Sequence, residues 1–129
     1  MPHLSIEYSQ GVGGDVRVEQ LCRAVHAAMI DAGIFPVAGI RVRAHRANVS
    51  IVADGLPQND FVAMTLAVGT GRSTEALQDA GGLIFGAAQG VLSDRLAEPH
   101  FALSLEIRQI DPDLSWKDTP IHARLAKKD

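Results

Sequence analysis

The feature that most constrains the fold of this chain is a strand–helix–strand pattern that occurs twice. In the first half, apolar and polar residues alternate over residues 3–8, as they do in a half-buried strand. A Gly-rich turn and Asp15, which we expect to cap a helix, precede an apolar stripe with helical spacing over residues 16–32, and Gly33 ends that helix. Alternation returns over residues 40–46, which predicts a second strand.

The second half of the chain repeats this order. Residues 61–69 predict a strand, Ser73 is placed to cap a helix over residues 74–93, and residues 101–110 predict the last strand. The stretch over residues 49–54 could add a further short strand. Glycines within the second helix cost it roughly 1 kcal/mol each relative to alanine, and we expect them to allow close packing onto a sheet; they are Gly81, Gly82, Gly86 and Gly90.

Two strand–helix–strand halves predict an α+β fold with a four-stranded sheet and both helices on one face. The right-handed crossover rule makes the two strands of each half parallel. We expect a single domain over residues 1–129, with repeat halves at about 2–54 and 60–110 and a C-terminal tail over 111–129. The helix-free face of such a sheet needs cover, so we expect the chain to self-associate.

Composition limits the classes of function. The net charge is −3 and no basic cluster occurs, which argues against a nucleic-acid partner. No apolar run approaches the roughly 20 residues that span a bilayer, and no signal-peptide pattern precedes the first strand, so we expect no membrane partner. The single Cys22 cannot form an intrachain disulfide, which favours the cytoplasm. The five histidines lack the spacing of metal ligands, so we expect no metal site.

The second residue of the chain is a candidate reagent. If Met1 is removed, Pro2 becomes a secondary amine at the end of a strand. Burial and neighbouring arginines both favour the neutral form of such an amine at pH 7. A neutral amine with a pKa near ambient pH is well placed to act as a general base, and the proton transfer needs no cofactor.

Three arginines are candidates to bind an acidic substrate. Arg41 and Arg43 share one face of their strand by alternation, where the alternative role is a solvated surface with ion pairs to Glu7 or Glu106. Arg72 precedes a helix start, where backbone N–H groups and the helix dipole favour an anion. Its planar guanidinium adds a fork that matches a carboxylate.

Nearly the whole chain follows one known pattern, in the stretches MPHLSIEYS, GIFPVAGIRVRAH, FVAMTLAVGTGRS and LSLEIRQIDPDLSWKDTPIHARL. Together these stretches closely resemble the 5-carboxymethyl-2-hydroxymuconate Δ-isomerase family of the tautomerase superfamily. The resemblance implies a homotrimer of βαβ repeats with three sites near the subunit interfaces. It also implies that Pro2, exposed by methionine removal, is the catalytic base. Arg41 and Arg72 are carried over as substrate or enolate binders, and Arg43 either binds substrate or serves trimer packing.

The resemblance further implies an isomerase of aromatic catabolism. Its substrate would be a small polycarboxylate, the ring-opened product of homoprotocatechuate, which a proton shift converts into a conjugated oxo-ene-dioate. Two alternatives stay open. The chain could be a tautomerase-fold enzyme that acts on another acid, or a non-catalytic trimer that binds a small acid or a protein.

Overall fold

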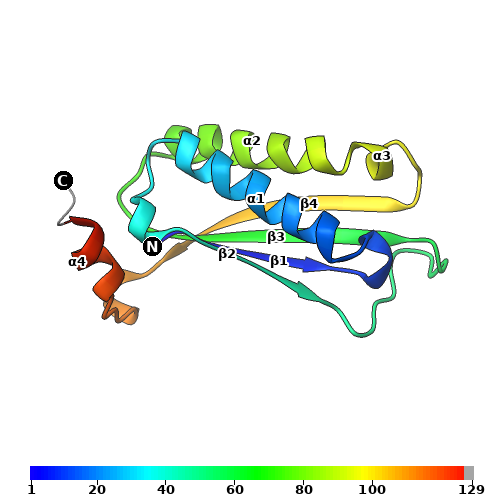
Figure 1. Ribbon diagram of the computed structural model, residues 1–129, viewed down its shortest axis with the longest axis horizontal. Helices are drawn as coiled ribbons and strands as arrows, with labels where there is room; N and C mark the ends of the chain where they lie inside the picture. The colour runs from blue at the N-terminus through cyan, green and yellow to red at the C-terminus, as the bar shows by residue number, and fades with distance from the viewer. Residues whose placement is uncertain (127–129) are drawn as a thin grey trace.

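The computed structural model describes residues 1–126, in which one four-stranded sheet packs against two long helices (Figure 1). The strands lie in the order β2-β1-β3-β4 and are β1 (His3–Tyr8), β2 (Arg41–Arg46), β3 (Asp60–Gly69) and β4 (Phe101–Ile110). The helices are α1 (Asp15–Asp31), α2 (Thr74–Val91), α3 (Ser93–Leu96) and α4 (Pro120–Ala126). Short 3-10 turns lie in the connections: η1 (Gln10–Val12), η2 (Val37–Gly39) and η3 (Pro112–Leu114).

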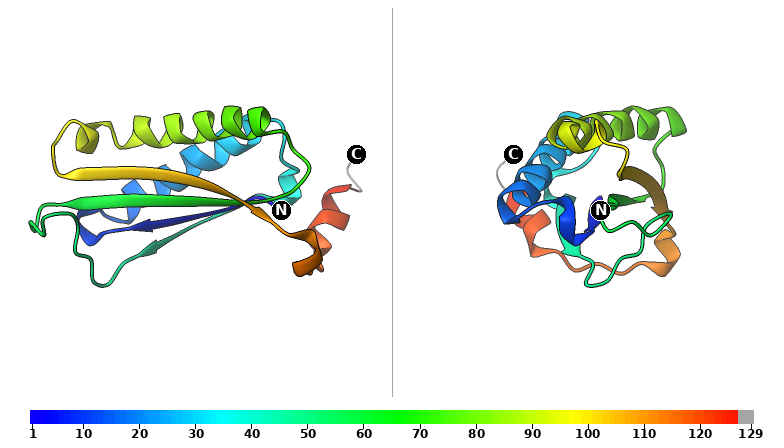
Figure 2. Two further views of the ribbon diagram at one scale, coloured as in Figure 1. Left: turned by 180° about the vertical axis from the view of Figure 1, so that it is seen from behind. Right: turned by 90° about the vertical axis from the view of Figure 1, so that its right-hand side faces the viewer.

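The strand pairing follows the predicted repeat. Strands β1 and β2 are parallel, as are β3 and β4, while β1 and β3 run antiparallel at the centre of the sheet. Each half is therefore a βαβ unit, and both crossover helices lie on the same face of the sheet (Figures 1 and 2). The predicted α+β architecture is confirmed.

The core is aliphatic and lies between the sheet and the two long helices. In β1, Leu4 and Ile6 are fully buried and alternate with side chains on the other face. Each fully buried side chain of this size contributes roughly 1.5–3 kcal/mol of transfer free energy. The other large buried side chains include Val62, Met64, Leu66 and Val68 of β3, Leu21, Val25 and Met29 of α1, and Leu77 and Ile84 of α2.

The helix ends differ slightly from the prediction. Asp15 is the first residue of α1 and Gly14 occupies the capping position, so the prediction that Asp15 caps the helix is wrong. Gly33 follows α1 with a φ of 73°, the left-handed conformation expected of a residue that ends a helix. The Ser73 hydroxyl accepts a hydrogen bond from the Ala76 backbone N–H (3.1 Å), which confirms Ser73 as the cap of α2.

The glycines of α2 do not share one role. A Cβ atom at Gly81 would lie 3.2 Å from Cδ1 of Ile107 in β4, so this glycine permits close approach to the sheet. At Gly82, Gly86 and Gly90, a Cβ atom would meet nothing within 4 Å. The prediction of close packing is wrong for these three, because they lie away from the helix stripe that contacts the sheet.

Residues 49–54 form part of a loop between β2 and β3, so the predicted extra strand is wrong. Val49 and Ile51 are 83% and 86% exposed, which means that no sheet edge buries their side chains. Ala53 and Gly55 both have positive φ and turn the chain, and the Asn59 side chain fastens the turn by donating to the Val52 carbonyl oxygen (3.0 Å). Local turn geometry therefore overrides the β-branched composition of this stretch.

The face of the sheet opposite to the helices carries small and polar side chains, among them Ser5, Ala63, Thr65 and Ser104. Both long helices lie on the other side (Figure 2). This arrangement is the one for which self-association was predicted, and that assembly stays a prediction. Within residues 1–126, no helix combines the length and apolarity needed to cross a membrane.

Candidate functional site

The strand pairing brings the predicted site residues to one end of the sheet. Because β1 and β2 are parallel, both strands begin there, with His3 paired to Arg41. The antiparallel β3 ends there, with Ala67 paired to His3. Arg72 follows the end of β3 after a short turn, so three segments that are distant in sequence converge on the amino terminus (Figure 1).

Pro2 lies at the start of β1 and is buried. Its carbonyl oxygen accepts a hydrogen bond from the Arg41 backbone N–H (3.1 Å), which joins it to the start of β2. A Cβ atom at Gly39 would lie only 3.1 Å from Cδ of Pro2, so the proline ring packs directly on the η2 backbone. The backbone and the ring of Pro2 are therefore both fixed.

Arg41 is half-buried beside this proline. Its Nη1 group donates to the carbonyl oxygens of Gly39 (3.0 Å) and Ala38 (3.3 Å), so the guanidinium is oriented by η2. The same turn thus contacts the ring of Pro2 and orients the side chain of Arg41.

Arg72 is oriented by the segment that follows α1. Its Nε atom donates to the Ile34 carbonyl oxygen (3.0 Å), and its guanidinium carbon lies 5.1 Å from the centroid of the Phe35 ring. The turn before it requires Gly71, which has a φ of 111°. A hydrogen bond through Nε leaves the two Nη groups of Arg72 as a fork for a carboxylate.

The terminal amino group, carried by Met1, lies in strongly positive surroundings. Burial lowers its pKa below the ordinary value of 8.0, and the charges of Lys117, Arg72 and Arg41 lower the pKa further. Within residues 1–126, none of these three cations forms an ion pair with a carboxylate. Among the described residues, these three cations therefore form a group of positive charge without ion-pair partners, although the net charge of the chain is −3.

Arg43 lies at the margin of the site. It is exposed and pairs with Ser5 in the sheet. It lies two residues after Arg41 on β2, so the two side chains are on the same face of the strand. Its charge contributes to lowering the pKa of His3. Within residues 1–126, neither Arg41 nor Arg43 forms an ion pair, so the suggested pairs to Glu7 or Glu106 are wrong, and Glu106 pairs with Arg108 instead.

Two residues that the sequence analysis did not select lie at this site. His3 has a buried Nε2 atom without a hydrogen-bond partner among the described residues, and burial together with the charges of Arg41 and Arg43 lowers its pKa. Lys117 is the other, and its charge lowers the pKa of the terminal amino group. The adjacency of His3 to Pro2 was a usable signal, whereas no local pattern marks Lys117.

No group of three or more metal-ligating side chains occurs in the part of the chain that the structure describes. Cys22 is half-buried in α1, where burial raises the pKa of its thiol. A raised pKa disfavours the reactive thiolate, so Cys22 acts as a packing residue.

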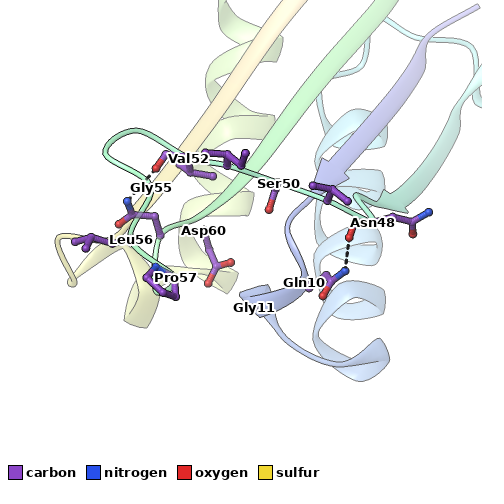
Figure 3. A pocket seen from close by; sticks show the side chains of 12 residues that line it. Gln10, Gly11, Asn48, Ser50, Val52, Gly55, Leu56, Pro57 and Asp60 are labelled. Atoms are coloured by element: carbon purple, nitrogen blue, oxygen red, sulfur yellow. Dashed lines mark hydrogen bonds between the residues drawn. The ribbon is translucent and has the colours of Figure 1, made fainter.

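A cavity of about 360 Å³ lies at the opposite end of the sheet, beneath the β2–β3 loop (Figure 3). Gln10 on one side of it donates to the Asn48 carbonyl oxygen (2.7 Å). The Asp60 carboxylate at its edge accepts hydrogen bonds from Arg95 (2.7 Å) and the Ser9 hydroxyl (2.5 Å). These bonds outweigh burial, which alone would raise the pKa, and lower the pKa of Asp60. None of the predicted site residues lines this cavity.

Paired βαβ units, with a buried proline and a group of cations at one sheet end, define this chain as a tautomerase-fold protein. The chain is similar to a solved "fused 4-OT wild type symmetric trimer", with a TM-score of 0.71, 16% identity, and coverage of 94% of this chain and 98% of the other. That similarity shows the fold alone.

Closer relatives give the family. Residues 2–125 match the family model described as 5-carboxymethyl-2-hydroxymuconate isomerase. A 5-carboxymethyl-2-hydroxymuconate Delta-isomerase from Escherichia coli is 35% identical over 123 residues, which cover 95% of this chain and 98% of the relative. The crystal structure of a 5-carboxymethyl-2-hydroxymuconate isomerase from Deinococcus radiodurans R1 has a TM-score of 0.88 and 32% identity, with 96% and 93% of the two chains covered. The chain belongs to the 5-carboxymethyl-2-hydroxymuconate isomerase family, and it is an isomerase.

Proposed function

We propose that this chain isomerises 5-carboxymethyl-2-hydroxymuconate and that Pro2, exposed by removal of Met1, is the general base. The observation that carries the proposal is the convergence of Pro2, Arg41 and Arg72 at one end of the sheet. The names of the relatives supply the substrate. No cofactor takes part.

The reaction moves one proton along a conjugated chain. The Pro2 nitrogen takes the proton of the 2-hydroxyl group, so that the O–H bond breaks and a dienolate forms. The same nitrogen returns the proton to carbon 5, where a C–H bond forms. The 2-hydroxy-2,4-diene thereby becomes a 2-oxo-3-ene, and atoms and electrons balance without an external reagent.

The surroundings of the amine suit this role. A base must be neutral to accept a proton, and burial with three nearby cations lowers the pKa of an amino group at this position. The same cations stabilise negative charge that develops on the dienolate oxygen. Arg41 and Arg72 bind substrate carboxylates, and Arg43 binds at the rim of the site or contributes to assembly.

We further propose a homotrimer located in the cytoplasm. The helix-free sheet face, with small side chains such as Ala63 and Ser104, is suited to contact other copies, and a relative of the same fold is described as a symmetric trimer. The one cysteine of the chain cannot form an intrachain disulfide, which agrees with a reducing compartment.

The test is turnover of 5-carboxymethyl-2-hydroxymuconate, followed by ultraviolet absorbance, on protein whose intact mass proves that Met1 is absent. We expect the Pro2 amine, beside the same cations as the Met1 amino group, to have a pKa below the ordinary α-amino value. Activity should then fall as pH decreases below this pKa, because a protonated amine accepts no proton. Pro2→Ala is expected to lower kcat by about 10²–10⁴-fold without changing the assembly. Unchanged kcat in this variant would remove Pro2 as the base. No turnover by the processed wild-type protein would leave the fold intact and direct the search to another acid or to a binding role.

A further inference from the structure

The C-terminal tail brings a third cation to the site. Lys117 lies between η3 and α4, and α4 contacts the η2 turn on which the Pro2 ring packs. Figure 1 and the left view of Figure 2, which are seen from opposite sides, both show α4 next to the amino terminus. The charge of Lys117 lowers the pKa of both the terminal amino group and His3, as expected for an ammonium group on a segment that precedes α4 at this end of the sheet.

The three cations around the amine differ in how firmly they are held. Arg41 is oriented by backbone carbonyls of η2, and Arg72 is oriented by the Ile34 carbonyl oxygen and the Phe35 ring. Both present planar guanidinium groups in fixed orientations. Lys117 is exposed and carries a compact ammonium group on a flexible stem.

The carboxylates of the proposed substrate differ in the same way, since two are held in a plane and the third is free to rotate. A muconate is a conjugated, planar chain with a carboxylate at each end, and two fixed planar forks suit such groups. A carboxymethyl substituent adds a third carboxylate on a tetrahedral carbon, so this group leaves the plane and rotates. A mobile ammonium group can follow it where a fixed guanidinium cannot.

We propose that Lys117 binds the third, out-of-plane carboxylate of a tricarboxylate substrate and makes the site specific for triacids over diacids. This role of Lys117 rests on the proposed function, because it presupposes that the site isomerises a muconate. It depends on the convergence of Lys117 with Arg41 and Arg72 around one amine and on the lack of ion pairs from these cations within residues 1–126.

Ligand binding tests this assignment independently of turnover. Isothermal calorimetry on Met1-free protein would compare tricarballylate, a triacid, with glutarate, a diacid, in the wild type and in Lys117→Met. We expect the variant to weaken tricarballylate binding by at least about tenfold and glutarate binding by less than about threefold, as for loss of one charge-assisted contact. Arg23→Met is the matched control, because it removes one positive charge from an exposed site on α1. Equal weakening of both ligands, no change, or no tricarballylate binding to the wild type would each overturn the proposal.

Kinetics separate a specificity role from an effect on the base. We expect Lys117→Met to lower kcat/KM for 5-carboxymethyl-2-hydroxymuconate much more than for 2-hydroxymuconate, and Lys117→Arg to restore most of the difference. Because Lys117 is one of the charges that lower the pKa of the terminal amine, the acid limb of the pH profile should move to higher pH in Lys117→Met, equally for both substrates, so the two substrates are compared at a pH well above this limb. If Lys117 acts only through the pKa of the base, kcat/KM falls equally for the two substrates, which contradicts the assignment. A wild type that turns over neither muconate but binds tricarballylate through Lys117 would refute the proposed reaction and keep the triacid site.

Discussion

The contact between Gly39 and Pro2 gives a direct test of how the candidate base is positioned. The φ angle of Gly39 is not positive, so alanine fits the backbone conformation there, and the effect of Gly39→Ala comes from the added methyl group alone. That methyl carbon would lie 3.1 Å from Cδ of Pro2. Carbon atoms in comfortable contact lie about 3.5–4.0 Å apart, so the proline ring must shift by about half an ångström.

The expected cost follows from the geometry of proton transfer. A displacement of about 1 Å at a reacting group costs about a hundredfold in rate, so half of that displacement costs on the order of tenfold. This corresponds to about 1.4 kcal/mol of activation free energy. We expect Gly39→Ala to lower kcat by about tenfold while KM changes less, measured by absorbance on Met1-free protein.

A matched glycine controls for stability. Gly82 lies in α2, where a Cβ atom meets nothing within 4 Å, so Gly82→Ala should leave kcat unchanged and stabilise the fold by about 1 kcal/mol. Thermal unfolding at equal protein concentration shows whether both variants are folded. A folded Gly39→Ala protein with wild-type kcat would refute the reasoning. A rise in KM alone would also contradict it, because η2 and the Arg41 side chain would then have moved in place of Pro2.

Two further outcomes follow from the structure. Arg72→Ala is expected mainly to raise KM if Arg72 binds a ground-state carboxylate, whereas a loss confined to kcat would place it on the developing dienolate. Asp60→Asn leaves the largely buried Arg95 without its countercharge and is expected to lower the free energy of unfolding by about 3 kcal/mol near pH 6, measured by urea denaturation at fixed protein concentration. Because the pKa of Asp60 is lower in the folded state than its ordinary value of 3.8, its stabilisation is present above about pH 4 and is lost as pH falls through the folded pKa. The difference between wild type and Asp60→Asn should therefore stay constant down to about pH 4 and shrink as the pH falls further, and a difference that stays constant into this acid range would contradict the role given to the ion pair.

The sequence was most informative where one side of an element faces water and the other faces the core. Alternation around Leu4 and Ile6 identified β1, and the helical stripe that includes Leu21 and Val25 identified α1. The same reasoning failed over residues 49–54, because β-branched side chains there are exposed on a turn-rich loop. Whether a β-branched segment is buried depends on the element that packs against it as well as on its own residues, so its composition alone does not predict a strand.

The candidate site was predictable only in part. Arg41 and Arg72 could be selected from strand alternation and from a helix start, and Pro2 from its place before the first strand. Lys117 could not, because it lies in a tail without regular periodicity, and its position depends on α4 contacting η2. The role of Gly39 could not be predicted either, because its contact with Pro2 is between the η2 turn and the start of β1, which are distant in sequence.

By itself, the sequence determined the two long helices, the four strands, their two βαβ units and the layer that the long helices form, because each follows from local periodicity and from short crossover connections. Only the tertiary structure decided which cations surround the amino terminus. The antiparallel pairing of β1 with β3 places the turn after β3 beside Pro2, and the tail after β4 returns to η2 with Lys117. Such contacts depend on the order of strands in the sheet and on packing between distant segments, which no local pattern of residues encodes.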